Sequence, residues 1–345
     1  MNVYYSTDHL QHQPPFEIFD GGDKIPNFEV PERAERILAA VKSAPWANIL
    51  PPADFGLDPI LAVHDRGYIE FLRSAFAEWQ ARPADEGIEK IALLPATFPP
   101  GRWRRTPKSL LGRAGLYMAD LAAPITGGTW QASLSSANCA LAGASDLLLG
   151  EKIAFALCRP PGHHAGKDYC AGYCYINNSA VAANRLSAHG KTAILDIDYH
   201  AGNGTQDIFY HRSDVLSISI HADPDFEYPY FAGCADETGE GAGLGFHHNF
   251  PLPAGTDSQA YLATLHTALD LISSFDPRFL VIPAGMDLFA GDPLGKFAVT
   301  TTGIRQIGHE IASLGLPSLV VMEGGYNNAA LGENVLALLQ NFANR

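Results

Sequence analysis

The stretch AILDIDYHAGNGTQ, residues 193–206, decides the fold class and raises the chemical question of this sequence. It begins as a short apolar run of the kind that forms a buried strand, and it then places Asp196, Asp198 and His200 at alternate positions. An isolated buried carboxylate costs several kcal/mol or shifts its pKa, so it normally has a counter-charge or a metal ion beside it. The sequence therefore asks which cation compensates these acids.

Four further apolar runs rich in β-branched residues have the character of this strand. Their nearly continuous hydrophobicity is typical of parallel strands that are covered on both faces. Helical patterns such as 177–190 and 258–275 lie between them, and this alternation predicts an α/β fold with a central, mainly parallel sheet flanked by helices. The four runs are IAFALC (153–158), VLSISI (215–220), FLVIPA (279–284) and SLVVME (318–323).

Polar residues and glycines follow each of the five runs directly, as RPPGHH, YHAGNG, HADPD, GMD and GGY. Ligands of open parallel sheets bind beyond the carboxyl ends of the strands, so we expect these five tails to converge in one crevice. No repeat, low-complexity segment or linker interrupts this core. Residues 1–345 are therefore expected to form a single domain.

The composition excludes several classes of partner. Of the 345 residues, 47% are hydrophobic and 17% are charged, and the formal net charge is −14, which argues against a nucleic-acid or anionic membrane partner. The five cysteines are odd in number and form no C-x-x-C pair, so neither a disulfide framework nor a cysteine zinc site is indicated. Without a signal peptide or a membrane-spanning run, we expect a cytoplasmic location.

Residues 95–113, PATFPPGRWRRTPKSLLGR, are proline-rich, basic and without clear periodicity. A loop of this length is usually either functional or disordered. Phe98, Trp103, Leu110 and Leu111 are poor choices for a disordered segment, so we expect an ordered surface or lid loop inserted at this point.

Asp198 and His200 are candidate metal ligands. At the end of a strand, the period of two places them on the same side, within reach of one ion. Oxygen and imidazole ligands suit Zn²⁺, which takes three protein ligands in catalytic sites, and Asp287 in PAGMDLFAGDPLG is the expected third ligand. Taken alone, the Asp-x-His pair is better explained by a capping Asp beside a core His.

The tandem His163–His164 in PPGHHAG changes this interpretation. Two adjacent imidazoles in a loop framed by Pro and Gly can aim at one metal-bound water, as a general base and an electrostatic partner. The alternative is one structural and one exposed histidine. The coincidence of all these strand tails favours the metal site.

Five long segments occur in an order that resembles a known family. They are CRPPGHHAGKDYCAGYCYINNSAVAA (158–183), ILDIDYHAGNGTQDIFY (194–210), DVLSISIHADP (214–224), GMDLFAGDPLG (285–295) and VVMEGGY (320–326). These segments resemble the histone deacetylase superfamily, and they are most similar to its bacterial acetylpolyamine amidohydrolases. The resemblance covers nearly the whole chain.

The resemblance implies a three-layer arginase/deacetylase fold that forms a deacetylase-like catalytic domain. In such a domain Asp198, His200 and Asp287 would hold Zn²⁺, although Fe²⁺ or Co²⁺ also suits an Asp/His/Asp site. Zinc would polarise the amide carbonyl and lower the pKa of its water. The family also binds K⁺ behind the zinc site, and the matching residues here are Asp196, Asp198, His200, Ser219 and Ile220.

The resemblance also implies catalytic roles. His164 matches the general base and acid, and His163 matches a second imidazole that is held protonated. Asp196 falls where a carboxylate supports His163, while Asn203 falls where a carboxylate or amide supports His164. Asp196 should raise the pKa of His163, whereas neutral Asn203 should leave His164 freer to accept a proton.

Four aromatic or glycine positions complete the implied substrate site. Tyr326 matches the tyrosine that donates to the developing oxyanion, with an ordinary aromatic wall residue as the alternative. Gly172 matches the backbone position that accepts the substrate amide. Tyr173 and Tyr228 match the walls of a narrow channel, although plain core packing is an alternative for both.

The sequence departs from the family pattern at three places. Ala201 replaces a second histidine after the ligand His200, and we expect zinc binding to survive this change. Leu294 offers no carboxylate at a rim position where some polyamine deacetylases have one. The basic segment carries a local charge of +5, which would repel a polycation unless these residues pair with acids or face solvent. Its basic residues are Arg102, Arg104, Arg105, Lys108 and Arg113.

These observations leave a small set of functions. The first is a zinc-dependent amidohydrolase that deacylates a small N-acylated amine of the acetylpolyamine type. The second uses the same site on neutral or xenobiotic amides, as in the dimethoate hydrolase type of the superfamily. A catalytically silent binding protein is disfavoured because every catalytic position is filled, and protein lysine deacetylation is disfavoured by the long loop. Because that loop often forms part of a dimer interface in this family, a homodimer is expected.

Overall fold

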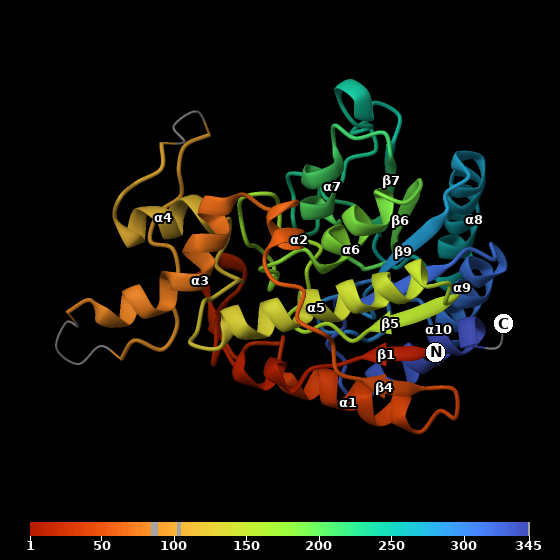
Figure 1. Cartoon of the computed structure of the whole chain (residues 1–345), viewed down its shortest axis with the longest axis horizontal. Helices are drawn as coiled ribbons and strands as arrows, with labels where there is room; N and C mark the ends of the chain where they lie inside the picture. The colour runs from red at the N-terminus through yellow and green to blue at the C-terminus, as the bar shows by residue number, and fades with distance from the viewer. Residues whose placement is uncertain (84–88, 102–104, 344–345) are drawn as a thin grey trace.

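The protein is built around one twisted sheet of eight parallel strands, in the order β4-β1-β5-β10-β9-β6-β7-β8. The computed structural model describes residues 1–83, 89–101 and 105–343. Helices cover both faces of the sheet, and the chain termini lie at the same end of it (Figure 1). The predicted α/β fold with a central parallel sheet is confirmed.

The elements alternate along the chain as the sequence predicts. The strands are β1 (Asn2–Tyr4), β4 (Asn48–Leu50), β5 (Ile153–Ala156), β6 (Thr192–Asp196), β7 (Val215–Ala222), β8 (His247–Leu252), β9 (Phe279–Ala284) and β10 (Ser318–Met322), with β2 (Glu17–Ile18) and β3 (Lys24–Ile25) in a separate antiparallel ribbon. The α-helices are α1 (Pro31–Lys42), α2 (Asp58–Leu61), α3 (Arg66–Ala81), α4 (Leu110–Tyr117), α5 (Thr129–Leu148), α6 (Asn178–Ser187), α7 (Asn203–Phe209), α8 (Ser258–Phe275), α9 (Thr301–Ser313) and α10 (Leu331–Ala343).

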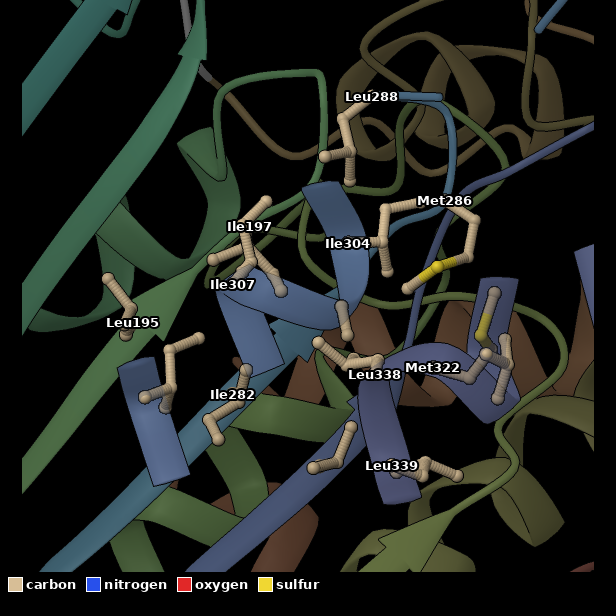
Figure 2. Close-up of a cluster of buried hydrophobic side chains, with 14 of the residues drawn as sticks. Leu195, Ile197, Ile282, Met286, Leu288, Ile304, Ile307, Met322, Leu338 and Leu339 are labelled. Carbon is tan, nitrogen blue, oxygen red and sulfur yellow. The ribbon is translucent and has the colours of Figure 1, made fainter. Parts of the chain in front are cut away.

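The sheet separates two hydrophobic cores because successive strand side chains point to opposite faces. In β9, Leu280 and Ile282 belong to one core, whereas Phe279 and Val281 belong to the other. The first core is closed by α1, α8, α9 and α10, and Figure 2 shows Ile282 facing the side chains of α9 and α10 within it. The second core is closed mainly by α3, α4, α5 and α6.

The five predicted strands all form, but β6 ends at Asp196 and not at Asp198. The period-of-two argument for Asp198 and His200 is therefore wrong, because neither residue lies on the strand. Two turns place them instead: the Asp198 amide donates to the Asp196 carboxylate at 3.0 Å, and the His200 amide donates to the Asp198 carboxylate at 2.9 Å.

The expected loop at 95–113 is only partly a loop. Helix α4 begins at Leu110, because the Ser109 side chain accepts a hydrogen bond from the Gly112 amide and caps the helix. Leu110 is buried in the second core, so it does not form a free apolar entrance. Trp103 lies outside the described residues.

All five cysteines are free thiols, and four of them are buried. Within the part of the chain that the structure describes, no helix is long and apolar enough to cross a membrane.

The burial of Ile282 gives a test of this packing. Replacing it by Ala (Ile282→Ala) removes a fully buried side chain between β9 and the α9–α10 layer, and it should lower the free energy of unfolding by about 2–5 kcal/mol. Leu149→Ala, at a position that is 85% exposed, is the matched control and should leave the unfolding curve in place. Urea unfolding of both variants measures this, and equal curves for the two would contradict the assigned core.

Candidate active site

The loops after four parallel strands bring the predicted chemical groups together at one edge of the sheet. His163 and His164 follow β5, Asp198 and His200 follow β6, and Asp287 follows β9. The loop after β10 carries Tyr326. Four of the five strand tails that were expected to converge are thus found together, as the rule for open parallel sheets requires.

Asp198, His200 and Asp287 form a compact cluster whose potential ligand atoms all lie within 4.8 Å of one another. His200 Nδ1 is 3.4 Å from Asp198 Oδ1 and 3.2 Å from Asp287 Oδ2. Both carboxylates are buried, while His200 is partly exposed. Two carboxylates and one imidazole form the donor set expected for a divalent cation of the zinc type.

Two glycines allow this close approach of the carboxylates. A side chain at Gly285 would place its Cβ 2.0 Å from Asp198 Oδ2, and one at Gly324 would place it 2.3 Å from Asp287 Oδ2. Burial, together with repulsion by the carboxylate of Asp198, raises the pKa of Asp287 to about 6. A bound cation would relieve this repulsion. The cluster therefore fits a metal ion by its donors and by its charge.

The two histidines of the tandem differ in their partners. Their ring centroids are 4.0 Å apart, with His163 Nδ1 3.0 Å from Asp196 Oδ2 and His164 Nδ1 2.7 Å from Asn203 Oδ1. Burial lowers the pKa of His163, but the carboxylates of Asp198 and Asp196 outweigh it and raise this pKa to about 10. Burial, followed by the positive charges of His163 and His200, holds the pKa of His164 well below its usual range.

Glu323 holds the tandem histidine loop, and sequence reasoning missed it. Its Oε2 accepts hydrogen bonds from the backbone amides of Gly162, at 2.6 Å, and His163, at 3.1 Å. Its Oε1 accepts a bond from the Ser179 hydroxyl at 3.0 Å. The only sequence signal was a carboxylate at the end of an apolar strand, in VVMEGGY.

Tyr326 is 8% exposed and is held from two sides that the sequence analysis did not identify. Asp292 accepts a hydrogen bond from the Tyr326 amide at 2.6 Å. The Arg33 guanidinium lies 4.7 Å from the centre of the Tyr326 ring, and its Nε donates to the carbonyl of Gly325 at 2.6 Å. Burial raises the pKa of Tyr326, so its hydroxyl keeps its proton as a donor.

A cavity of about 410 Å³ leads to these groups, and His164, His200 and Tyr326 line it. All four predicted substrate residues also contribute to its wall, namely Gly172, Tyr173, Tyr228 and Leu294. The cavity therefore combines reactive groups with a largely apolar wall. Its other apolar lining residues include Ile18, Phe19, Phe98 and Leu121.

Among the described basic residues of this segment, namely Arg105, Lys108 and Arg113, none lines the cavity. Arg113 pairs with Glu78, away from the residues that line the cavity, and Arg105 and Lys108 are exposed. Arg102 and Arg104 lie outside the described residues. The predicted repulsion of a polycation is therefore removed at Arg113, because a carboxylate neutralises it.

Two of the predicted potassium residues, Asp198 and His200, belong to the metal cluster itself, and the other three lie on β6 and β7. Asp196 and Ser219 are directly opposite each other in the pairing of β6 with β7, and both are buried together with Ile220. Ala201 is also buried: a Cβ at Gly233 would lie only 2.7 Å from its methyl group. A side chain at position 233 would therefore collide with Ala201.

Comparisons with known proteins agree with this geometry. The histone deacetylase domain model matches residues 27–342. The chain is 47% identical to acetylpolyamine amidohydrolase 1 of Pseudomonas aeruginosa over 98% of this chain and 97% of that protein, and 45% identical to acetylpolyamine amidohydrolase of Mycoplana ramosa over 99% and 100%.

A solved structure gives the same result for the fold. The crystal structure of acetylpolyamine aminohydrolase from Burkholderia pseudomallei matches with a TM-score of 0.94 and 40% identity, over 99% of this chain and 98% of that one. Family, fold and strand-end chemistry thus agree, and this chain belongs to the histone deacetylase family as a hydrolase of amide bonds.

Proposed function

We propose that this protein is a zinc-dependent deacetylase of small N-acetylated amines, with acetylpolyamines as its substrate class. The observation that carries the proposal is a cavity lined by His164, Tyr326 and His200, the last of which belongs to the Asp198–His200–Asp287 cluster. The names of the full-length relatives, which are acetylpolyamine amidohydrolases, support the choice of substrate.

Asp198, His200 and Asp287 would hold the zinc ion, and the same donors also suit Fe²⁺ or Co²⁺. When bound there, zinc supplies Lewis-acid polarisation of the substrate carbonyl and lowers the pKa of its water. K⁺ would lie behind this cluster, next to Asp196 and Ser219, where buried carboxylate needs positive charge.

His164 is the general base in this proposal. Asn203 Oδ1 can only accept from the ring, so His164 Nδ1 carries the proton and Nε2 keeps its lone pair. Nε2 takes the proton from the attacking water and later gives it to the leaving amine. His163 stays protonated beside Asp196 and contributes positive charge near the developing oxyanion.

Tyr326 donates its hydroxyl proton as a hydrogen bond to that oxyanion. Gly172 contributes its carbonyl as the acceptor for the substrate N–H, and Tyr173 and Tyr228 flank the acyl group. Residues 1–345 would act as one catalytic domain, as a homodimer in the cytoplasm.

A second candidate function is the hydrolysis of neutral amides in the same site. The apolar cavity residues Ile18, Phe19, Phe98, Leu121 and Leu294 favour it, because they offer no charge to a cationic amine.

Metal removal tests the cluster directly. The wild-type protein should retain about one zinc ion per chain after dialysis, whereas Asp198→Ala and Asp287→Ala should lose it, because three protein ligands are needed. Chelation should also lower Tm, since the buried carboxylates then lack their counter-charge. Mass spectrometry of bound metal checks this, with the exposed Asp225→Ala as control. A folded Asp198→Ala protein that still holds zinc would place the ion elsewhere.

A substrate panel separates the two functions. Acetylputrescine, acetylspermidine, an acetyl-lysine peptide and a neutral anilide are compared at equal enzyme concentration, and the acetylated amines should have the highest kcat/KM. Tyr326→Phe should lower kcat by about 10²–10³, because it removes an oxyanion donor. Tyr210→Phe, which lies outside the cavity, is the control. A clear preference for the anilide would instead support the second function.

The Asn203–His164 pair makes the pH dependence testable. Because the base must be unprotonated, kcat/KM falls as the pH drops through the pKa of His164. In Asn203→Asp, a carboxylate 2.7 Å from Nδ1 favours the imidazolium, so this acid limb should move upward by about 1–2 pH units. Asn48→Asp, at an exposed position, should leave the profile in place. An unchanged limb in Asn203→Asp would remove His164 from the role of base.

A further inference from the structure

Asp120 lies in the wall of the cavity, in the loop between α4 and α5, and the sequence analysis gave it no role. Its Oδ2 accepts two hydrogen bonds, from the Tyr228 hydroxyl at 2.7 Å and from the Gly172 amide at 2.8 Å. Its Oδ1 accepts the Ala122 amide at 2.9 Å. One carboxylate thus joins three separate segments of the wall.

Both main partners of Asp120 pack against His164. The Tyr228 ring meets the His164 ring edge to face, with centroids 4.9 Å apart, and it lies 6.1 Å from the ring of His200. Gly172 has a left-handed backbone conformation with φ 48°, and a Cβ there would lie 2.5 Å from His164 Cδ2 and 3.0 Å from the Tyr228 hydroxyl. Gly172 and Tyr228, which share Asp120 as their anchor, therefore both lie against the His164 ring.

The hydrogen bonds of Asp120 argue against a direct role in binding the charged end of a substrate. Its Oδ2 already accepts from a hydroxyl and an amide, so few acceptor sites are left for a direct hydrogen bond from the distal ammonium of a substrate. A carboxylate engaged in this way should act equally on cationic and neutral substrates.

We propose that Asp120 is a positioning residue, which fixes Tyr228 and Gly172 against the base His164 and so sets the geometry of proton transfer. This inference rests on the proposed function, because it assumes that His164 acts on a bound amide. It concerns kcat rather than substrate choice, since Asp120 reaches the reacting atoms only through its partners.

Steady-state kinetics of Asp120→Ala, Asp120→Asn and Tyr228→Phe test the proposal with acetylputrescine and a neutral anilide. Asp120→Ala should lower kcat about tenfold to hundredfold on both substrates with little change in KM, because a misplaced base slows chemistry. Asp120→Asn keeps one acceptor oxygen and should recover part of the loss. In the Tyr228→Phe background, Asp120→Ala should cost less than in the wild type, because one of its targets is already lost.

Two results would overturn the proposal. A rise in KM for acetylputrescine alone would make Asp120 an ammonium-binding acid, and an unchanged kcat in Asp120→Ala would leave it without a catalytic effect. If Asp120→Ala does not fold, Asp120→Asn and Tyr228→Phe carry the same test at unchanged Tm. Asp225→Ala, at an exposed position outside the cavity lining, is the control for the loss of one negative charge.

A measurement that does not depend on catalysis separates the positioning role of Asp120 from the proposed function. The imidazole NMR signals of His164 should shift in Asp120→Ala and Tyr228→Phe but not in Asp225→Ala, whichever amide the enzyme accepts. Failure of the wild type on every acetylated amine would refute the proposed function alone. Unmoved His164 signals in both cavity variants would refute the positioning role alone.

Discussion

The structure depends on carboxylates that are buried at the carboxyl ends of parallel strands. Asp196, Asp198 and Asp287 are each almost inaccessible to solvent, and burial without compensation would cost several kcal/mol for each charge. Backbone amides, the His163 imidazole and the cation implied by the cluster with His200 share this compensation. Folding and chemistry are therefore coupled, because the charges that attract the metal are the ones that the fold has to neutralise. The glycines at this edge of the sheet, such as Gly285 and Gly324, leave room for the closely spaced carboxylates.

A second buried ion network supports the site from behind. Glu29 lies between two buried guanidinium groups, at 2.8 Å from Arg33 and 2.9 Å from Arg159. Arg33 then donates to the carbonyls of Glu323 and Gly325, which belong to the loop that carries Tyr326. Because the Glu323 side chain also binds the amides of the tandem histidine loop, the donor tyrosine and the base share one support. Glu29 Oε2 and Arg159 Nε form no hydrogen bond, but the remaining bonds of this buried network tie both loops to one support, as a preorganised active site requires.

The sequence predicts the central strands and the reactive groups because both carry local signals. Apolar runs such as 279–284 and the paired histidines His163 and His164 stand out without any knowledge of the fold. Strands of three residues, such as β1 and β4, carry too little periodicity to be identified, and the start of α4 depends on a cap at Ser109 inside a basic segment. Supporting residues were missed for a different reason. Arg33 lies about 290 positions from the carbonyls that it binds, so no spacing rule connects them.

The charges around the cavity also determine how an amine could be selected. Of the described residues that line it, the acids are Asp120 and Glu227; the first binds Tyr228 and Gly172, and the second pairs with Lys296. Both acids of the cavity wall therefore already have partners, so neither is free to form an ion pair with a cationic substrate. The net charge of −14 and exposed acids such as Asp225 act over a longer range. Long-range attraction raises the rate of encounter more than the strength of binding, and it weakens as salt is added. Selection for amines in this protein would thus appear in kcat/KM, while the apolar wall and the reactive groups determine kcat.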